Sequence, residues 1–309
     1  MANQQITLLA NQQITLYENL RACSYTPFYL AQTLGLFKDE GLDINLQLSP
    51  SPPETAQGLI DGRADVSFGG PMRVLMHHNI DDDCPLICFG QVVARDPFIL
   101  IGQKPNFTFS FRDLIGPKIG IATDVPTPWM TLQDDLSRAG VDPDLINKSV
   151  DKTMQENTIL FKKGELDVVQ VFEPYAQELL ESGGHVWHSF STRGDIAFTT
   201  FYATKSFVDS NRFVCKSLIN AINTSLTKIH ESSAKEISDL IRPFYFPHLA
   251  PTSYENIINR YKESKLWPKT TALPATSFVR LKAALLSGDL IQKDIPYERI
   301  VDRELSEPR

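Results

Sequence analysis

The stretch ADVSFGGPMRV, residues 64–74, places two glycines between a short apolar strand and the start of a helix. The apolar residues before Gly69 suit a buried strand, the glycine pair breaks it, and Pro71 is typical of the first turn of a helix. Such a joint can seat a ligand on the free N–H groups of a helix N-terminus, or it can carry a catalytic residue. The surrounding sequence decides between these uses.

Strand and helix patterns alternate on both sides of this joint, which favours an α/β fold with largely parallel sheets. The strict alternation of LDINLQL, residues 42–48, predicts a strand. The continuous apolar runs at 86–94 and 97–102 predict strands that are buried on both faces. Thr26 as N-cap and Pro27 as the first helical residue predict the start of a helix.

The two ends of the chain differ from its middle. Beyond about residue 205, four successive segments have helical periodicity, and the polar end 296–309 is expected to be extended. At the other end, the hexapeptide NQQITL occurs at 3–8 and again at 11–16. We expect the second copy to form the first strand and residues 1–10 to be peripheral.

A short pattern also recurs about one hundred residues along the chain. The motif G-x-x-D-V begins at Gly62 and again at Gly164, and upstream of each copy EGLD (40–43) parallels AGVD (139–142). In both copies the glycine is expected to close a helix and the aspartate to open the next strand. The repetition predicts two similar α/β lobes, with ligands beyond the carboxyl ends of their strands.

Composition excludes several classes of function. The 309 residues are 42% hydrophobic and 22% charged, and the net charge of −7 is spread without a basic block, so no nucleic-acid partner is expected. No apolar run approaches the ~18–20 residues that cross a bilayer, so no membrane insertion is expected.

The start of the chain lacks the features of a signal peptide. We therefore expect a cytoplasmic protein, or a periplasmic one if a leader was removed. Four cysteines without a C-x-x-C motif favour a reduced compartment.

Two motifs point to a known family. GLFKDEGLD at 35–43, followed by GRADV at 62–66, resembles the signature of a superfamily of two-lobed binding proteins, and DLIGPKIGIAT and VFEPYAQELLESG match its second lobe. The branch in question includes the nitrate-, taurine- and alkanesulfonate-binding components of ABC importers and the fungal thiamine-pyrimidine precursor synthase. The resemblance covers about residues 13–230.

The resemblance implies a type II periplasmic-binding-protein-like fold with extra C-terminal helices. One lobe would hold residues 11–95 and 200–309 and the other residues 96–199, joined by a two-segment hinge with the ligand in the cleft between them.

The synthase branch is an enzyme, and its functional residues are missing here. It uses a lysine that holds pyridoxal phosphate, a histidine consumed as substrate, and a cysteine-rich stretch; the matching positions are Gly69, Arg73 and the cysteine-free segment 193–202. We therefore expect no cofactor and no catalysis, with a divergent thiamine-pyrimidine enzyme as an alternative. Adjacent His77 and His78 do not share a helix face, so no metal site is expected either.

Candidate ligand contacts lie at strand ends and helix starts that face the expected cleft. They are Tyr25, Thr26, Gly69 and Gly70 in the first lobe, Thr123, Asp124, Thr127, Trp129 and Glu173 in the second, and Asp96, Phe98 and Asp195 near the crossings.

Several of these candidates have a structural alternative. The glycine pair could serve packing alone, and the two threonines could be only N-caps. Trp129 could belong to the core, and Glu173 could only cap the helix that follows it.

The charges of the candidates indicate the character of the ligand. Four are carboxylates (Asp96, Asp124, Glu173 and Asp195), and only Arg73 is a nearby base. Carboxylates accept from N–H donors and repel anions, so we expect a small nitrogen-bearing, pyrimidine-like ligand linked to thiamine precursors, stacked on Trp129 or Phe98. The alternative is an importer component for sulfonates or nitrate, with an ABC permease as partner. The oligomeric state is left open.

Overall fold

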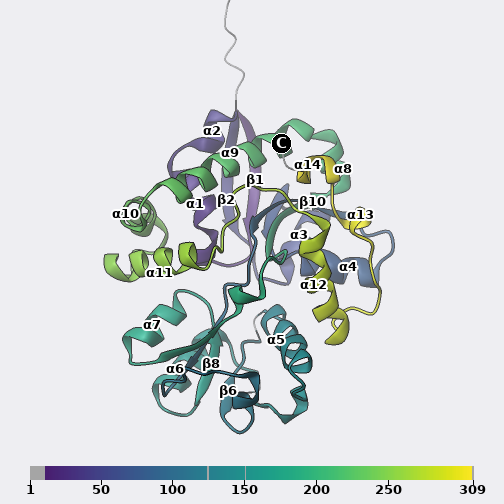
Figure 1. Cartoon of the computed structure of the whole chain (residues 1–309). Coiled ribbons are helices and arrows are strands. Elements are labelled where there is room, and N and C mark those ends of the chain that lie inside the picture. The colour runs from purple at the N-terminus through teal and green to yellow at the C-terminus, as the bar shows by residue number, and fades with distance from the viewer. Residues whose placement is uncertain (1–10, 124, 150, 308–309) are drawn as a thin grey trace, which may run out of the picture.

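The structure is a computed structural model that describes residues 11–123, 125–149 and 151–307. Within these residues the chain forms two five-stranded sheets, each flanked by helices, one above the other in Figure 1. This confirms the predicted two-lobed α/β fold. We call the part built on the upper sheet the first lobe and the part built on the lower sheet the second lobe. The first NQQITL copy and Asp124 lie outside the described residues.

The first sheet has the strand order β2-β1-β3-β10-β4. Strand β1 pairs in parallel with β2 and β3, whereas β10 is antiparallel to both β3 and β4. The bounds are β1 Gln12–Glu18, β2 Leu42–Leu48, β3 Val66–Gly69, β4 Leu86–Val93 and β10 Thr199–Thr204. The predicted strands at 42–48 and 86–94 are confirmed, and every residue of β4 is buried.

The second sheet repeats this plan with the order β7-β6-β8-β5-β9. Strand β6 is parallel to β7 and β8, and β5 is antiparallel to β8 and β9. The bounds are β5 Ile99–Gly102, β6 Lys118–Gly120, β7 Asn147–Lys148, β8 Val168–Val171 and β9 His185–Ser189. The sheets are thus mixed and not largely parallel. The antiparallel strands β5 and β10 enter their sheets directly after the chain crosses between lobes, so no crossover helix sets a parallel direction.

Helices cover both sheets, and the C-terminal third is almost entirely helical (Figure 1). The bounds are α1 Thr26–Thr33, α2 Leu36–Asp39, α3 Glu54–Ile60, α4 Met72–Ile80, α5 Thr127–Arg138, α6 Met154–Lys162, α7 Tyr175–Glu181, α8 Lys205–Ser210, α9 Arg212–Glu231, α10 Ala234–Tyr245, α11 Pro251–Glu263, α12 Ala275–Ser287, α13 Tyr297–Ile300 and α14 Arg303–Ser306. Short 3-10 turns are η1 Cys23–Tyr25, η2 Phe111–Leu114, η3 Pro143–Leu145 and η4 Phe190–Arg193.

Two local predictions need correction. Helix α1 has Tyr25 as its N-cap, and Thr26 is already helical, with its hydroxyl donating to the carbonyl oxygen of Cys23 at 2.7 Å. The end of the chain contains the short helices α13 and α14 instead of an extended segment. Both helices have four residues, too few for a helical period to show in the sequence.

The repeated G-x-x-D-V motif has the same structure in both lobes. Gly62 and Gly164 follow α3 and α6 with φ of +72° and +74°, a conformation that favours glycine. The Asp65 carboxylate accepts from the N–H of Thr15 at 2.8 Å, and the Asp167 carboxylate accepts from the N–H of Lys118 at 2.8 Å. Each aspartate therefore links the start of its strand, through a hydrogen bond, to the neighbouring strand of the same sheet.

Two segments join the lobes, one between β4 and β5 and one between η4 and β10. They are hydrogen-bonded to each other: Ile196 N–H donates to the Ala94 carbonyl at 2.8 Å, and Phe198 N–H donates to the Val93 carbonyl at 3.2 Å. The division of the chain at residues 95/96 and 199/200 stays a prediction.

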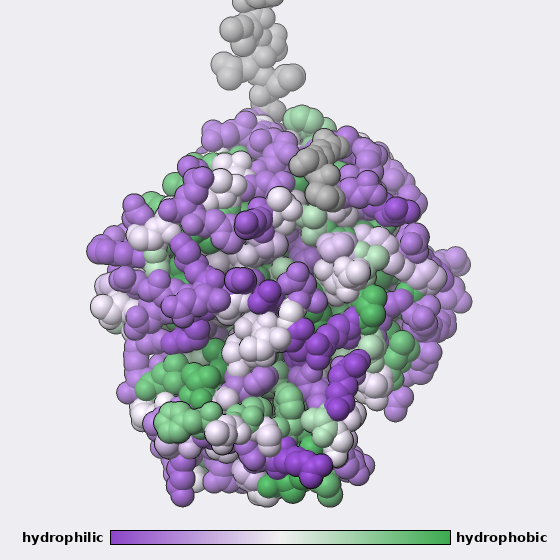
Figure 2. All heavy atoms as spheres, in the orientation of Figure 1, coloured by the Kyte–Doolittle hydropathy of each residue, from purple (hydrophilic) through white to green (hydrophobic). Residues whose placement is uncertain are grey.

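Most of the face seen in Figure 2 is hydrophilic, with hydrophobic patches mainly on its lower half. No helix in the described ranges is both long and apolar enough to span a membrane.

Candidate functional site

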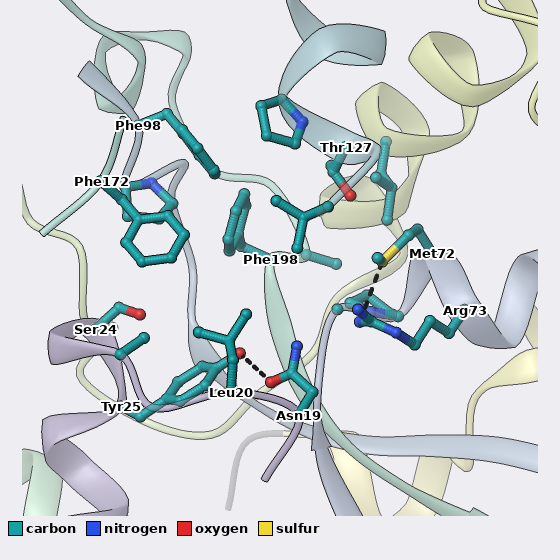
Figure 3. A pocket seen from close by; sticks show the side chains of 18 residues that line it. Asn19, Leu20, Ser24, Tyr25, Met72, Arg73, Phe98, Thr127, Phe172 and Phe198 are labelled. Atoms are coloured by element: carbon teal, nitrogen blue, oxygen red, sulfur yellow. Dashed lines mark hydrogen bonds between the residues drawn. The ribbon is translucent and has the colours of Figure 1, made fainter. Parts of the chain in front are cut away.

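A cavity lies between the two sheets, with about 520 Å³ of space that no atom fills. Both lobes, both crossings and the C-terminal helix α12 contribute to its wall (Figure 3). The lining residues are 19, 20, 22, 24, 25, 70–73, 97, 98, 125, 127, 128, 172, 197, 198 and 281.

One side of the cavity is aromatic. The ring of Phe98 lies edge-on to Phe172 with centroids 5.0 Å apart, and it is tilted against Phe198 at 6.3 Å. In Figure 3 these three rings lie on the side opposite Arg73. Aromatic faces and edges in this arrangement suit a flat or chain-like apolar group.

The opposite end of the cavity is polar and formed by the first lobe. The Tyr25 hydroxyl donates to Asn19 Oδ1 at 2.7 Å, so the amide nitrogen of Asn19 keeps its two N–H groups for another partner. Burial raises the pKa of Tyr25, although the positive charge of Arg73 opposes this shift. Tyr25 therefore stays protonated at neutral pH and continues to hold Asn19 in place.

Arg73 carries the only charge among the described lining residues. It lies in the first turn of α4, and only 6% of it is exposed. Its Nε donates to the carbonyl oxygen of Pro52 at 2.7 Å and its Nη1 contacts the sulfur of Met72 at 3.7 Å, but no described carboxylate forms an ion pair with it. A buried guanidinium without a counter-charge is unfavourable, and an anion or a strong acceptor at this end of the cavity would offset that cost.

Four of the predicted site residues line this cavity: Tyr25, Gly70, Phe98 and Thr127. Gly70 allows the close approach of the α4 start, because a Cβ there would lie 2.4 Å from the sulfur of Met72. Gly69 is one residue further from the cavity, and its own Cβ would press on Asn19 and the hydroxyl of Tyr202. The glycine pair of the opening stretch thus shapes the polar end of the cavity.

Three of the four predicted carboxylates, Asp96, Glu173 and Asp195, lie in the described part of the chain, and none of these three lines the cavity. Asp96 is buried and paired with Arg193, and Glu173 is buried and paired with Arg260. Asp195 is exposed and pairs with Arg95 at 3.2 Å. The arginines that neutralise these groups are far away in sequence, so the charge count along the chain did not reveal them. The lining therefore gives no support to the expected nitrogen-bearing ligand.

Three other predicted residues, Thr26, Thr123 and Trp129, are not among the lining residues. Thr26 is in the core, where its hydroxyl is 2.8 Å from that of Tyr254. Thr123 donates to the carbonyl oxygen of Lys152 at 3.0 Å, and Trp129 lies beneath the Lys148 ammonium, 4.0 Å from the ring centroid. A ligand role for these residues stays a prediction.

The sequence did not identify several of the lining residues. Asn19 directly follows β1, so the strand-end rule could have found it. Phe172 follows β8 in the same way. Leu281 lies in the middle of α12, and nothing in its local sequence distinguishes it from a core leucine.

The residues present do not fit pyridoxal phosphate. No lysine is among the described lining residues, and Gly69 cannot form a Schiff base. In the described part of the chain, no group of three or more His, Cys, Asp or Glu side chains is placed to hold a metal ion.

Comparisons with known proteins agree with this fold. A relative named "Putative binding protein YtlA" from Bacillus subtilis (strain 168) is 27% identical over 289 residues, 92% of this chain and 85% of its own. The periplasmic aliphatic sulphonate binding protein SsuA from Escherichia coli superposes with a TM-score of 0.76 over 96% of this chain and 98% of that chain. Its 15% identity shows the fold alone.

The match to an enzyme is shorter. The 4-amino-5-hydroxymethyl-2-methylpyrimidine phosphate synthase of Legionella pneumophila is 28% identical over 120 residues, 38% of this chain and 36% of the synthase. The similarity to YtlA, which covers most of this chain, supports a ligand-binding role. The family model described as "NMT1/THI5 like" matches residues 22–235, which is more than half of the chain, and the protein therefore belongs to the NMT1/THI5-like family.

Proposed function

We propose that the protein is a non-catalytic binding protein whose ligand is a small organic anion. The anionic group would lie against Arg73 and the amide of Asn19, and the apolar body against Phe98, Phe172 and Phe198. The observation that carries the proposal is Arg73, which is buried at the cavity wall without a described carboxylate partner.

The relatives support a binding role and an anionic ligand. YtlA is named as a binding protein and matches most of this chain, and SsuA is named for binding aliphatic sulphonates. A sulfonate or carboxylate would accept hydrogen bonds from the free N–H groups of Arg73 and Asn19. A pyrimidine ligand, linked to thiamine precursors, is the competing possibility that the experiment below includes.

Titration calorimetry with matched ligands tests the proposal. Propane-1-sulfonate and taurine have almost the same shape, but taurine replaces a methyl group with an ammonium group. No described lining residue carries a negative charge to receive that ammonium, so we expect propane-1-sulfonate to bind more tightly. Benzenesulfonate, which can also pack on the phenylalanines, should bind more tightly than either.

The matched control is an exposed arginine of the same lobe. Arg73→Met should weaken benzenesulfonate binding by roughly tenfold to a hundredfold, the range for losing a charge-assisted hydrogen bond. Arg63→Met should leave it unchanged, because Arg63 pairs with Glu54 and Asp61 on the surface. Binding of 4-amino-5-hydroxymethyl-2-methylpyrimidine, with no binding of the sulfonates or of benzoate, would overturn the proposal.

A further inference from the structure

Four segments of the cavity wall meet at one cluster of charges. Asp96 lies beside the lining residue Phe98 in the first crossing, and Arg193 lies in η4 before the second crossing. Asp135 is on α5, whose first turn lines the cavity, and Arg280 is on α12, next to the lining residue Leu281. The cluster therefore connects parts of the wall that are far apart in the sequence.

Asp135 is shared by both arginines. Its Oδ2 accepts from Arg193 Nε at 2.8 Å, and its Oδ1 accepts from Arg280 Nη2 at 2.8 Å. Arg193 also pairs with Asp96, and Arg280 Nη1 donates to the carbonyl oxygen of Arg193 at 3.1 Å. Two arginines thus balance two aspartates, and Arg280 is the member that α12 contributes.

Helix α12 belongs to the C-terminal part of the chain but packs against α5 of the second lobe (Figure 1). Just beyond its end, a Cβ at Gly288 would lie only 2.3 Å from the sulfur of Met130 on α5. In the middle of the helix, Leu281 is 1% exposed and turns into the cavity wall. The placement of α12 against α5 consequently decides where Leu281 lies.

We propose that Arg280 is a positioning residue that closes the cavity. By binding Asp135 and the carbonyl of Arg193, it holds α12 against the second lobe, so that Leu281 completes the wall around the ligand. It does not itself line the cavity. The proposal rests on the proposed function in so far as a ligand occupies the cavity, but the α12–α5 contact can be measured without any ligand.

Loss of Arg280 should leave the protein folded. Asp135 would keep Arg193 as its partner, and the Glu173–Arg260 ion pair between α11 and the second lobe would remain. The change should therefore affect how often α12 leaves α5 and should not unfold either lobe.

Disulfide trapping in the ligand-free full chain tests this directly. Cysteines introduced by Met130→Cys and Gly288→Cys should cross-link readily, while the four native cysteines stay buried. Adding Arg280→Gln should slow the cross-linking about tenfold, within the usual range of coupling between sites. Arg280→Lys, which keeps a charge but not the forked geometry, should restore part of the rate. Arg138→Gln is the matched control and should change nothing, because the ion pair that Arg138 forms among the described residues is with Asp134 of the same helix.

Ligand kinetics provide the second readout, with benzenesulfonate as the probe. Arg280→Gln should raise the dissociation rate about tenfold and leave the association rate within about twofold, because the residue holds the closed wall and does not contact the ligand. Failure of the wild type to bind benzenesulfonate would count against the proposed function alone. An unchanged cross-linking rate in Arg280→Gln would overturn the positioning role, whatever the ligand result.

Discussion

Two buried arginines of this protein differ in what neutralises them. Arg193 has two aspartates within hydrogen-bond distance. The described hydrogen-bond partners of the Arg73 side chain are a carbonyl oxygen and a thioether sulfur. Removing one partner of a buried ion pair leaves an uncompensated charge in the interior, whereas a buried guanidinium without a carboxylate partner already carries that cost. The contrast supports the proposal that Arg73 binds the ligand.

This contrast predicts opposite effects on stability. In the ligand-free protein, Arg73→Met should leave the free energy of unfolding unchanged or raise it by up to about 2 kcal/mol, because a buried unpaired charge is removed. Arg193→Met should lower it by about 3–5 kcal/mol, because Asp96 loses its partner in the interior. Urea denaturation measures both. A loss of several kcal/mol in Arg73→Met would show that Arg73 is needed for the fold.

His78 should make stability depend on pH. Burial lowers the pKa of His78 from its ordinary value of 6.5, with its hydrogen bond to the carbonyl of Leu86 opposing the shift. The unfolded chain then binds more protons than the folded protein near pH 6, so stability falls as the pH decreases below about 6.5.

Replacing this histidine isolates its contribution. His78→Gln can keep a donor for the Leu86 carbonyl without titrating. The urea midpoint of this variant should therefore fall less steeply between pH 7.5 and 5.5 than that of the wild type. Urea denaturation at about half-unit steps of pH measures the two slopes. One histidine can account for at most about 1.4 kcal/mol per pH unit. An identical slope in both proteins would show that His78 titrates normally.

Among the elements, the helix–glycine–strand unit is the part of the fold that the sequence predicts best. Gly62 and Gly164 adopt the same positive φ, and Asp65 and Asp167 make the same hydrogen bond to the next strand. The glycine conformation depends only on local chemistry, so it is visible in a single sequence. Strand β2 is predicted to the residue for the same reason. Each aspartate hydrogen bond, in contrast, reaches a strand 50 or 49 residues earlier in the chain.

Gly164 allows a clean test of this local chemistry. No atom lies within 4 Å of a Cβ placed there, so Gly164→Ala should lower stability by about 1 kcal/mol through backbone conformation alone. Gly164→Asn should cost less, because asparagine tolerates a positive φ. Thermal unfolding of the two variants gives their order, and an equal loss in both would contradict this explanation.

Elements that depend on distant contacts were not predicted. Strand β10 pairs with β3 and β4 only because the chain returns from the second lobe, and β7 has just two residues. Neither leaves a periodic signal. The extra helices were expected beyond residue 205, but the sequence did not show that α12 would contact the second lobe.

At the scale of the whole molecule, the described wall of the cavity is assembled from seven separate parts of the chain. Strand ends and helix starts, such as Tyr25 and Thr127, could be found from the sequence because the fold places them at the cleft. The roles of Asp96 and Glu173 could not, because they depend on Arg193 and Arg260, which are supplied by distant segments. With these two carboxylates paired across the fold, Arg73 is the charge on which the proposed anionic ligand rests.

A crystal structure of the complex with 4-bromobenzenesulfonate tests the central claim most directly, because the anomalous signal of bromine locates the ligand without bias. The account predicts the sulfonate within hydrogen-bond distance of Arg73 and Asn19, with the bromophenyl ring among Phe98, Phe172 and Phe198. A saturated crystal with the ligand bound elsewhere, or with the sulfonate turned away from Arg73, would contradict it.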